Sequence, residues 1–210
     1  MMRVRPSWLV AAGVLALLGA VLGLSEFTVT LLNYIGLAAL VSLGLVLLTG
    51  VGGLTSCGQA AFVGLGAYAT AWLTTATLPA WLAWTGGSPW AGLLLGLLIT
   101  GVFAWILGGI SLRLSGHYLP LGTIAWGLSL YFLFGTFDFL GGHTGLSGLP
   151  PITLFGTQLV GGRDLFWLIW IVLGVAMLLI SNLLDSREGR AIRALKGGMV
   201  MAESMGVDTA

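Results

Sequence analysis

One serine in this sequence stands in a pattern used for nucleophilic catalysis. The string Gly145-Leu-Ser-Gly148 has the Gly-x-Ser-Gly spacing found around the nucleophile of one class of intramembrane protease. That chemistry needs a histidine base beside the serine. In those proteases the base comes from a later membrane segment, whereas His117 and His143 both precede Ser147. We therefore interpret the stretch as a glycine-rich turn, and no catalytic residue is predicted.

The sequence lacks the residues that metal binding and proton-coupled transport usually need. The two histidines and the one cysteine, Cys57, form no cluster with metal-ligand spacing, so no metal site is predicted. The apolar segments carry no acidic or basic residue away from their ends, although ion-coupled carriers usually place such groups inside the membrane. The single lysine, Lys196, precedes two glycines, and a phosphate-binding loop needs Ser or Thr there. Directed transport would therefore need ATP hydrolysis on a partner, and no cofactor is expected in this chain.

The composition predicts that most of the surface faces lipid. Charged residues make up 7% of the 210 residues and hydrophobic residues 58%, while a soluble domain is about 25% charged. The basic residues form no patch with interleaved aromatics, so no nucleic-acid partner is expected. We predict an all-α, polytopic transmembrane helix bundle.

Six stretches are apolar enough, and near enough to about 20 residues, to be membrane spans. We expect a transmembrane domain over residues 1–184 and a cytoplasmic segment over 185–210. The third stretch is the weakest because it is rich in Gly, Ala and Thr. The expected spans are 7–24, 29–48, 58–76, 90–110, 118–135 and 165–184.

The placement of basic residues predicts the orientation. Loops that stay in the cytoplasm carry an excess of Lys and Arg. If the N-terminus is cytoplasmic, only Arg163 faces outward, and an even number of spans returns the chain to the cytoplasm. The basic residues then inside are Arg3, Arg5, Arg113, Arg187, Arg190, Arg193 and Lys196.

Small residues recur every four positions in two of the expected spans. Such stripes let two helix backbones approach closely in a membrane. They predict a compact bundle but no particular function. One stripe comprises Gly92, Gly96, Thr100, Ala104 and Gly108, and the other Ala12, Ala16 and Ala20.

Two polar residues stand at the edges of expected spans. Gln59 opens the third span among residues of low bulk, which fits tight packing, a helix beside a translocation path, or both. His117 lies where the chain re-enters the membrane. It fits either a polar path or an interfacial histidine with one satisfied hydrogen bond.

The segment 185–210 has the pattern of a short, two-part helical element. Ser186 can cap a helix that begins near Arg187. Gly197-Gly198 permits a sharp break, and Gly206 can end a second piece. The apolar residues Ile192, Leu195 and Met199 lie at helical spacing on one face. This pattern favours a plug for a groove on another protein, or alternatively a helix on the membrane surface.

Four ordered motifs resemble permease subunits of branched-chain amino acid ABC importers. They are Gly58-Gln-Ala-Ala-Phe-Val-Gly-Leu-Gly-Ala-Tyr68, Leu112-Arg-Leu-Ser-Gly-His-Tyr-Leu119, Gly145-Leu-Ser-Gly-Leu-Pro150 and Gly189-Arg-Ala-Ile-Arg193. The final stretch, Ala202-Glu-Ser-Met-Gly-Val-Asp208, resembles the family's ATPase-coupling loop. The resemblance covers roughly residues 43–209. Family chains continue through further spans, so we expect this chain to be an N-terminal portion.

The resemblance implies a multi-pass transporter subunit of the cytoplasmic (inner) membrane, and not an enzyme. Its implied partners are a second permease subunit, two ATPase subunits that bind ATP, and an extracytoplasmic substrate-binding protein. Branched-chain or other hydrophobic amino acids would cross by alternating access, although relatives also move amides and urea. A polytopic assembly or scaffold subunit remains the alternative.

The resemblance also suggests which residues act. The translocation-path candidates are Ser56, Gln59 and His117. The residues expected to couple to the ATPase are Arg190, Ile192, Leu195, Met199, Ala202, Glu203 and Gly206.

Overall fold

The computed structural model describes residues 23–75, 88–111, 118–154 and 157–198, together with Glu203 and Gly206. The chain divides into two compact units, one formed by Met1–Leu54 with Val160–Ala210 and the other by Thr55–Leu159. The expected first span, 7–24, lies almost wholly outside the described residues, and so does the alanine stripe within it.

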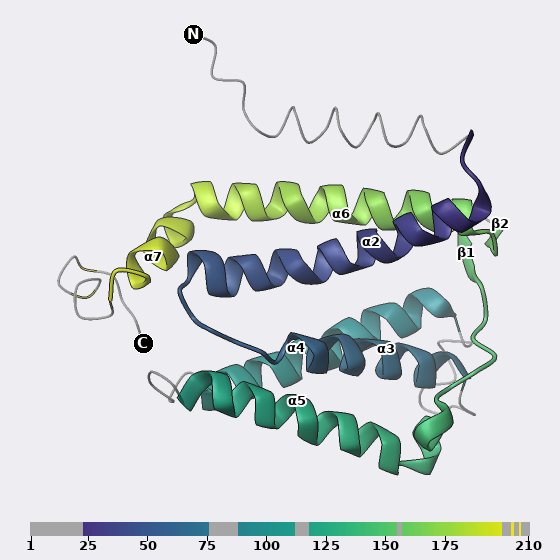
Figure 1. Ribbon diagram of the computed structural model, residues 1–210, viewed down its shortest axis with the longest axis horizontal. Helices are drawn as coiled ribbons and strands as arrows, with labels where there is room; N and C mark the ends of the chain where they lie inside the picture. Colours follow the sequence, from purple (N-terminus) through teal and green to yellow (C-terminus); the bar gives the residue numbers. More distant parts are fainter. Residues whose placement is uncertain are drawn as a thin grey trace, which may run out of the picture. The chain divides into compact units, whose positions relative to one another are not determined.

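The first unit is built on two long helices that lie side by side and run in the same direction. Helix α2 spans Glu26–Leu45 and continues as a π-helical turn over Val46–Val51. Helix α6 spans Gly162–Asp185 and lies alongside α2, and the short helix α7, Arg187–Leu195, follows it (Figure 1). Helix α2 begins three residues before the expected span because the Ser25 hydroxyl accepts a hydrogen bond from the Thr28 backbone N–H, at 3.4 Å.

Close packing and one amide contact hold α2 against α6. Val29 and Phe166 are completely buried between the two helices. A Cβ atom at Gly36 would lie 2.8 Å from Ile169 Cγ2, so glycine permits the close approach. The Asn33 side-chain amide donates to the Gly162 carbonyl at 2.8 Å. These contacts make α2 and α6 a single packed pair.

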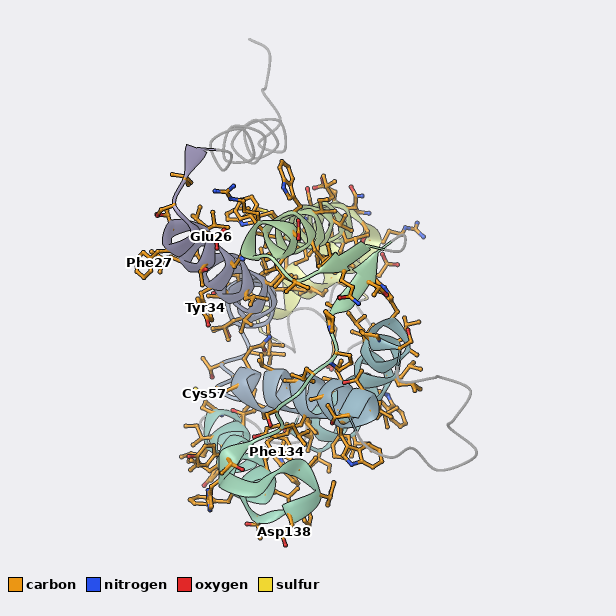
Figure 2. All side chains as sticks on the ribbon, turned by 90° about the vertical axis from the view of Figure 1, so that its right-hand side faces the viewer. Glu26, Phe27, Tyr34, Cys57, Phe134 and Asp138 are labelled. Atoms are coloured by element: carbon orange, nitrogen blue, oxygen red, sulfur yellow. The ribbon has the colours of Figure 1, made fainter. Side chains whose placement is uncertain are left out.

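The opposite face of α2 carries large exposed side chains. Phe27 and Tyr34 are 79% and 68% exposed and point away from α6 (Figure 2). Exposed aromatic and aliphatic side chains on a long apolar helix are typical of a surface that meets lipid or another membrane helix.

The second unit contains three helices. They are α3, Gln59–Thr75, α4, Pro89–Ser111, and α5, Tyr118–Thr136 (Figure 1). Ala61 and Leu65 of α3 pack against Leu130 of α5 to form a small core. Tyr68 stacks on Phe134 at 4.7 Å between ring centroids, on the side of α5 that faces α3 (Figure 2).

The glycine stripe of the fourth expected span is the surface that α3 packs against, over part of its length. A Cβ atom at Gly92 would lie 2.7 Å from Thr74 Cγ2, and one at Gly96 would overlap Thr70 Oγ1. Thr100 Oγ1 lies 3.4 Å from the Cβ position of Gly66. Among the described residues, Gly108 has no neighbour within 4 Å of its Cβ position. The predicted close approach is therefore confirmed from Gly92 to Thr100 but does not extend to Gly108.

The connection between α5 and α6 is more structured than a turn. Two 3₁₀ turns, η4 at Asp138–Leu140 and η5 at Gly142–Thr144, precede strands β1, Ile152–Leu154, and β2, Thr157–Leu159. The strands are antiparallel, with Ile152 opposite Leu159. The expected glycine-rich turn is confirmed, since the backbone φ is positive at Gly141, Gly142, Gly145 and Gly148. The small hairpin is a feature that the sequence analysis did not predict.

Four described helices are long and apolar enough to cross a membrane: Glu26–Val51, Pro89–Ser111, Tyr118–Thr136 and Gly162–Asp185. Each agrees with one expected span to within three residues at either end. Helix α3 lies at the expected third span but has 17 residues, slightly short of a full crossing. The predicted fold class, an all-α polytopic bundle, is confirmed, and the count of six spans stays a prediction.

Candidate functional site

Two of the three path candidates lie at the start of α3. The chain is non-helical from Gly53 to Gly58, between the π-helical turn and α3. Ser56 and Gln59 are both half-buried. The Ser56 hydroxyl accepts a hydrogen bond from the Gly58 backbone N–H at 3.4 Å, and Gln59 is the first residue of α3. The third candidate, His117, lies outside the described residues.

Thr123 of α5 holds this non-helical segment and was not predicted. Its hydroxyl accepts a hydrogen bond from the Cys57 backbone N–H at 3.1 Å and donates one to the Pro120 carbonyl at 2.9 Å. A Cβ atom at Gly58 would lie 3.4 Å from both Thr123 Cβ and the Thr123 carbonyl oxygen. In the sequence, Thr123 stands out only as a polar residue three positions after a proline in an apolar span. That signal marks a polar contact but does not reveal its partner.

Replacing Thr123 by valine should loosen the segment around Ser56. Valine keeps the shape of threonine but leaves the Cys57 N–H without its acceptor, a loss of about 1 kcal/mol. We expect amide exchange at Cys57 to become roughly fivefold faster, as measured by hydrogen–deuterium exchange on peptides covering 54–59. Thr123→Ser retains the hydroxyl and should keep the protection. Equal protection in Thr123→Val and the unaltered protein would contradict this role.

The segment 185–210 begins with a capped helix, as predicted. Ser186 has an extended backbone, and its hydroxyl accepts a hydrogen bond from the Gly189 N–H at 3.2 Å. A hydrogen bond from the backbone N–H of Glu188 itself lowers the pKa of the Glu188 carboxyl, which favours the charged form beside the positive end of α7. The cap therefore fixes where α6 ends and α7 begins.

Gly189 brings the first turn of α7 against the end of α6. A Cβ atom at this position would overlap the Leu183 carbonyl oxygen and lie 2.6 Å from Leu184 Cα. These are backbone atoms, so they cannot move aside as the end of a flexible side chain could. The tight elbow between the two helices therefore requires glycine at 189.

The structure places some of the predicted coupling residues and leaves others outside the described part. Arg190 is exposed on α7, and Ile192 is half-buried. The helix ends at Leu195, and Gly198 has a φ of +117°, so the predicted break is confirmed. The side chain of Leu195, and Met199 and Ala202 altogether, fall outside the described residues.

Glu203 and Gly206 are described at the far end of this segment. Glu203 is helical and exposed, and its carbonyl accepts a hydrogen bond from the Gly206 N–H at 2.9 Å. Gly206 has a φ of +80°, the left-handed conformation in which glycine commonly follows the end of a helix, and this agrees with the predicted end of the second piece there. Whether these residues contact an ATPase remains a prediction.

Comparison with known proteins identifies what the chain is similar to. A family model described as the permease component of the branched-chain amino acid transport system matches residues 27–210. The high-affinity branched-chain amino acid transport system permease protein LivM of Salmonella typhimurium is 29% identical over 192 residues, which cover 80% of this chain and 43% of the relative. LivM of Escherichia coli is 29% identical over 207 residues, covering 87% of this chain and 47% of the relative.

The chain therefore spans about half the length of the curated relatives it matches. These relatives are permease proteins of transport systems and not enzymes. No solved structure matches the chain.

Proposed function

Because this chain belongs to the family of branched-chain amino acid transport system permease components, we propose that the complete gene product containing it carries hydrophobic amino acids across a membrane. The observation that carries the proposal is the family match over residues 27–210. The long apolar helices, whose outward faces expose large hydrophobic side chains, support the membrane setting. The substrates proposed are branched-chain amino acids or others of similar apolar character.

The proposed energy source is ATP hydrolysed by an ATPase that is a separate subunit or a fused domain. The four ordered motifs that resemble ABC importer permeases support this choice. The complete assembly would contain a second permease subunit, two ATPases and an extracytoplasmic binding protein that delivers the substrate. The residues from Arg190 of α7 to Gly206 would contact the ATPase, with Arg190, Ile192 and Glu203 among the contact residues.

The proposed mechanism is alternating access, in which ATP-driven movement of α7 tilts the helices around the path. Ser56 and Gln59 are proposed to lie beside that path. Non-helical backbone inside a bilayer is stable only where protein buries it or where it lines water. The non-helical segment that leads into α3 therefore fits a position next to an aqueous route. His117 is proposed to line the same route.

The proposed location is the cytoplasmic membrane, with six spans in this chain and the N-terminus inside. The excess of Lys and Arg in the loops that would then face the cytoplasm supports this orientation. Arg187, Arg190 and Arg193 of α7 would lie in the cytoplasm, and Arg163 at the start of α6 would face the other side.

Substrate uptake in a strain that lacks the gene tests the proposal. We expect the deletion to reduce uptake of radiolabelled leucine and the complete gene to restore it, with unlabelled isoleucine and valine competing. Competition by amides or urea instead would change the substrate class. Unaltered uptake of all these compounds would contradict the transport proposal and favour a scaffold role.

A further inference from the structure

Three basic side chains donate to carbonyl groups at the ends of two membrane helices: those of Arg190 and Arg193 in α7, and that of Lys196 directly after it. Arg193 donates to the Leu184 carbonyl at the end of α6, and its Nε also donates to the Gly189 carbonyl at 3.3 Å. Arg190 donates to the Asp185 carbonyl at 3.4 Å. Lys196 Nζ donates to the Gly50 carbonyl at 2.9 Å, and Gly50 lies in the π-helical turn that ends α2.

These contacts satisfy a need that both helices have. The last four carbonyl groups of a helix lack partners within the helix, and that end carries a partial negative charge. Leu184 and Asp185 are the final residues of α6, and Gly50 is the penultimate residue of the π-helical turn. One short cytoplasmic element therefore caps α2 and α6 together.

The contact with α2 is supported by a second observation. Gly53 follows the π-helical turn with a φ of +71°. A Cβ atom there would lie 3.3 Å from Lys196 Cγ and 3.4 Å from Lys196 Cα. The backbone at Gly53 and Lys196, the residue directly after α7, are thus packed together, in addition to the hydrogen bond to Gly50. Arg187, by contrast, makes none of these carbonyl contacts.

We propose that Lys196 is a positioning residue for transport, which fixes the end of α7 to the end of α2. Movement of α7 then acts on α2 and α6 as one body, because Arg193 holds α7 to α6 and Lys196 holds it to α2. The chain continues directly from Gly53 into the segment with Ser56 and Gln59. This inference rests on the proposed function, since it concerns how ATP-driven motion reaches the membrane helices.

The test is a coupling measurement on the complete transporter in liposomes with its ATPase. Lys196→Met keeps the length of the side chain but removes the donor. We expect the ratio of substrate transported to ATP hydrolysed to fall about fivefold, which is the effect of losing one hydrogen bond. The abundance of the protein in the membrane should stay normal. Lys196→Arg should restore most of the ratio. Arg187→Gln is the matched control, because it removes one positive charge from α7 without breaking a carbonyl contact, and it should leave the ratio unchanged.

The outcomes separate this inference from the proposed function. The positioning role is overturned by any of three results: an unchanged ratio in Lys196→Met, the same loss in Arg187→Gln, or no restoration by Lys196→Arg. None of these results contradicts the proposed transport function. An unaltered assembly that hydrolyses ATP but moves no amino acid would overturn the proposed function, whatever Lys196 does.

A distance measurement tests the same inference without transport. Spin labels on cysteines at Leu48 and Gly197, with Cys57 replaced by serine, report the separation of the ends of α2 and α7. Both sites are exposed. Lys196→Met should broaden the distance distribution between the two labels, and Arg187→Gln should not. A distribution as narrow as that of the unaltered protein would show that Lys196 does not fix the two ends.

Discussion

Replacing Gly189 by valine should abolish most uptake while the protein still inserts into the membrane. The new Cβ would overlap the Leu183 carbonyl oxygen and lie 2.6 Å from Leu184 Cα, so the first turn of α7 must leave the end of α6. Overpacking of this kind costs about 1–3 kcal/mol. It also displaces the Arg193 contact with the Leu184 carbonyl. We expect at least a roughly tenfold loss of uptake, because about 1.4 kcal/mol at the proposed coupling helix corresponds to that factor.

The control for this variant is a glycine in the same unit that has free space. Gly174 of α6 has no neighbour within 4 Å of its Cβ position in the part of the chain that the structure describes. Gly174→Val should therefore keep uptake near the normal level. Uptake by Gly189→Val equal to that of Gly174→Val, at similar membrane abundance, would show that the elbow between α6 and α7 has no part in transport.

Replacing Gly96 by leucine should separate α3 from α4 and destabilise the second unit. The Cβ of the new side chain would overlap Thr70 Oγ1. It would also lie 3.3 Å from both the Gly66 carbonyl oxygen and the Thr70 backbone nitrogen. Membrane helices associate mainly through close packing of small residues, so a bulky side chain removes the interaction itself. We expect a loss of roughly 2 kcal/mol. Size-exclusion chromatography after heating in detergent should show that the variant unfolds at a lower temperature than the unaltered protein.

Gly108 provides the matched control on the same helix and the same predicted stripe. No atom of the described residues lies within 4 Å of its Cβ position. Gly108→Leu should therefore unfold at nearly the normal temperature. Equal destabilisation by the two variants would mean that the contact with α3 is not what makes Gly96 sensitive.

The comparison of Gly96 with Gly108 also shows what sequence can and cannot predict here. The four-residue spacing of small residues identifies a face on which a helix can approach. It does not identify the neighbour, nor how far along the face the two helices stay in contact. Helix α3 approaches α4 at Gly92, Gly96 and Thr100, whereas Ala104 is exposed and Gly108 has no neighbour close to its Cβ position among the described residues. Tertiary packing decides this, and a repeat in one segment carries no information on it.

Local signals predicted their structures well. Helix spans follow from the length of apolar runs, and the Ser186 cap and the break at Gly198 follow from residues whose backbone preferences are strong. The contacts that build the candidate site are different. Thr123 with Cys57, and Lys196 with Gly50, join residues 66 and 146 positions apart. Such pairs carry no spacing signal in a single sequence, so only the structure reveals them.

The strands β1 and β2 were missed for a further reason. Each has three residues, and only two residues separate them along the sequence. Strands of this length are too short to give an alternating pattern that stands out from a polar loop. Part of their support comes from outside the hairpin, since the Trp90 indole N–H donates to the Thr153 carbonyl at 2.7 Å.

The most direct test of the transport proposal is ATP-dependent accumulation in proteoliposomes. The complete gene product would be reconstituted with its second permease subunit, its ATPases and the binding protein, and supplied with radiolabelled leucine and ATP. We predict that leucine accumulates inside against its gradient with ATP, and that a non-hydrolysable ATP analogue or omission of the binding protein stops accumulation. Accumulation at the same rate with the analogue, or none in any condition by a fully assembled complex, would contradict the account.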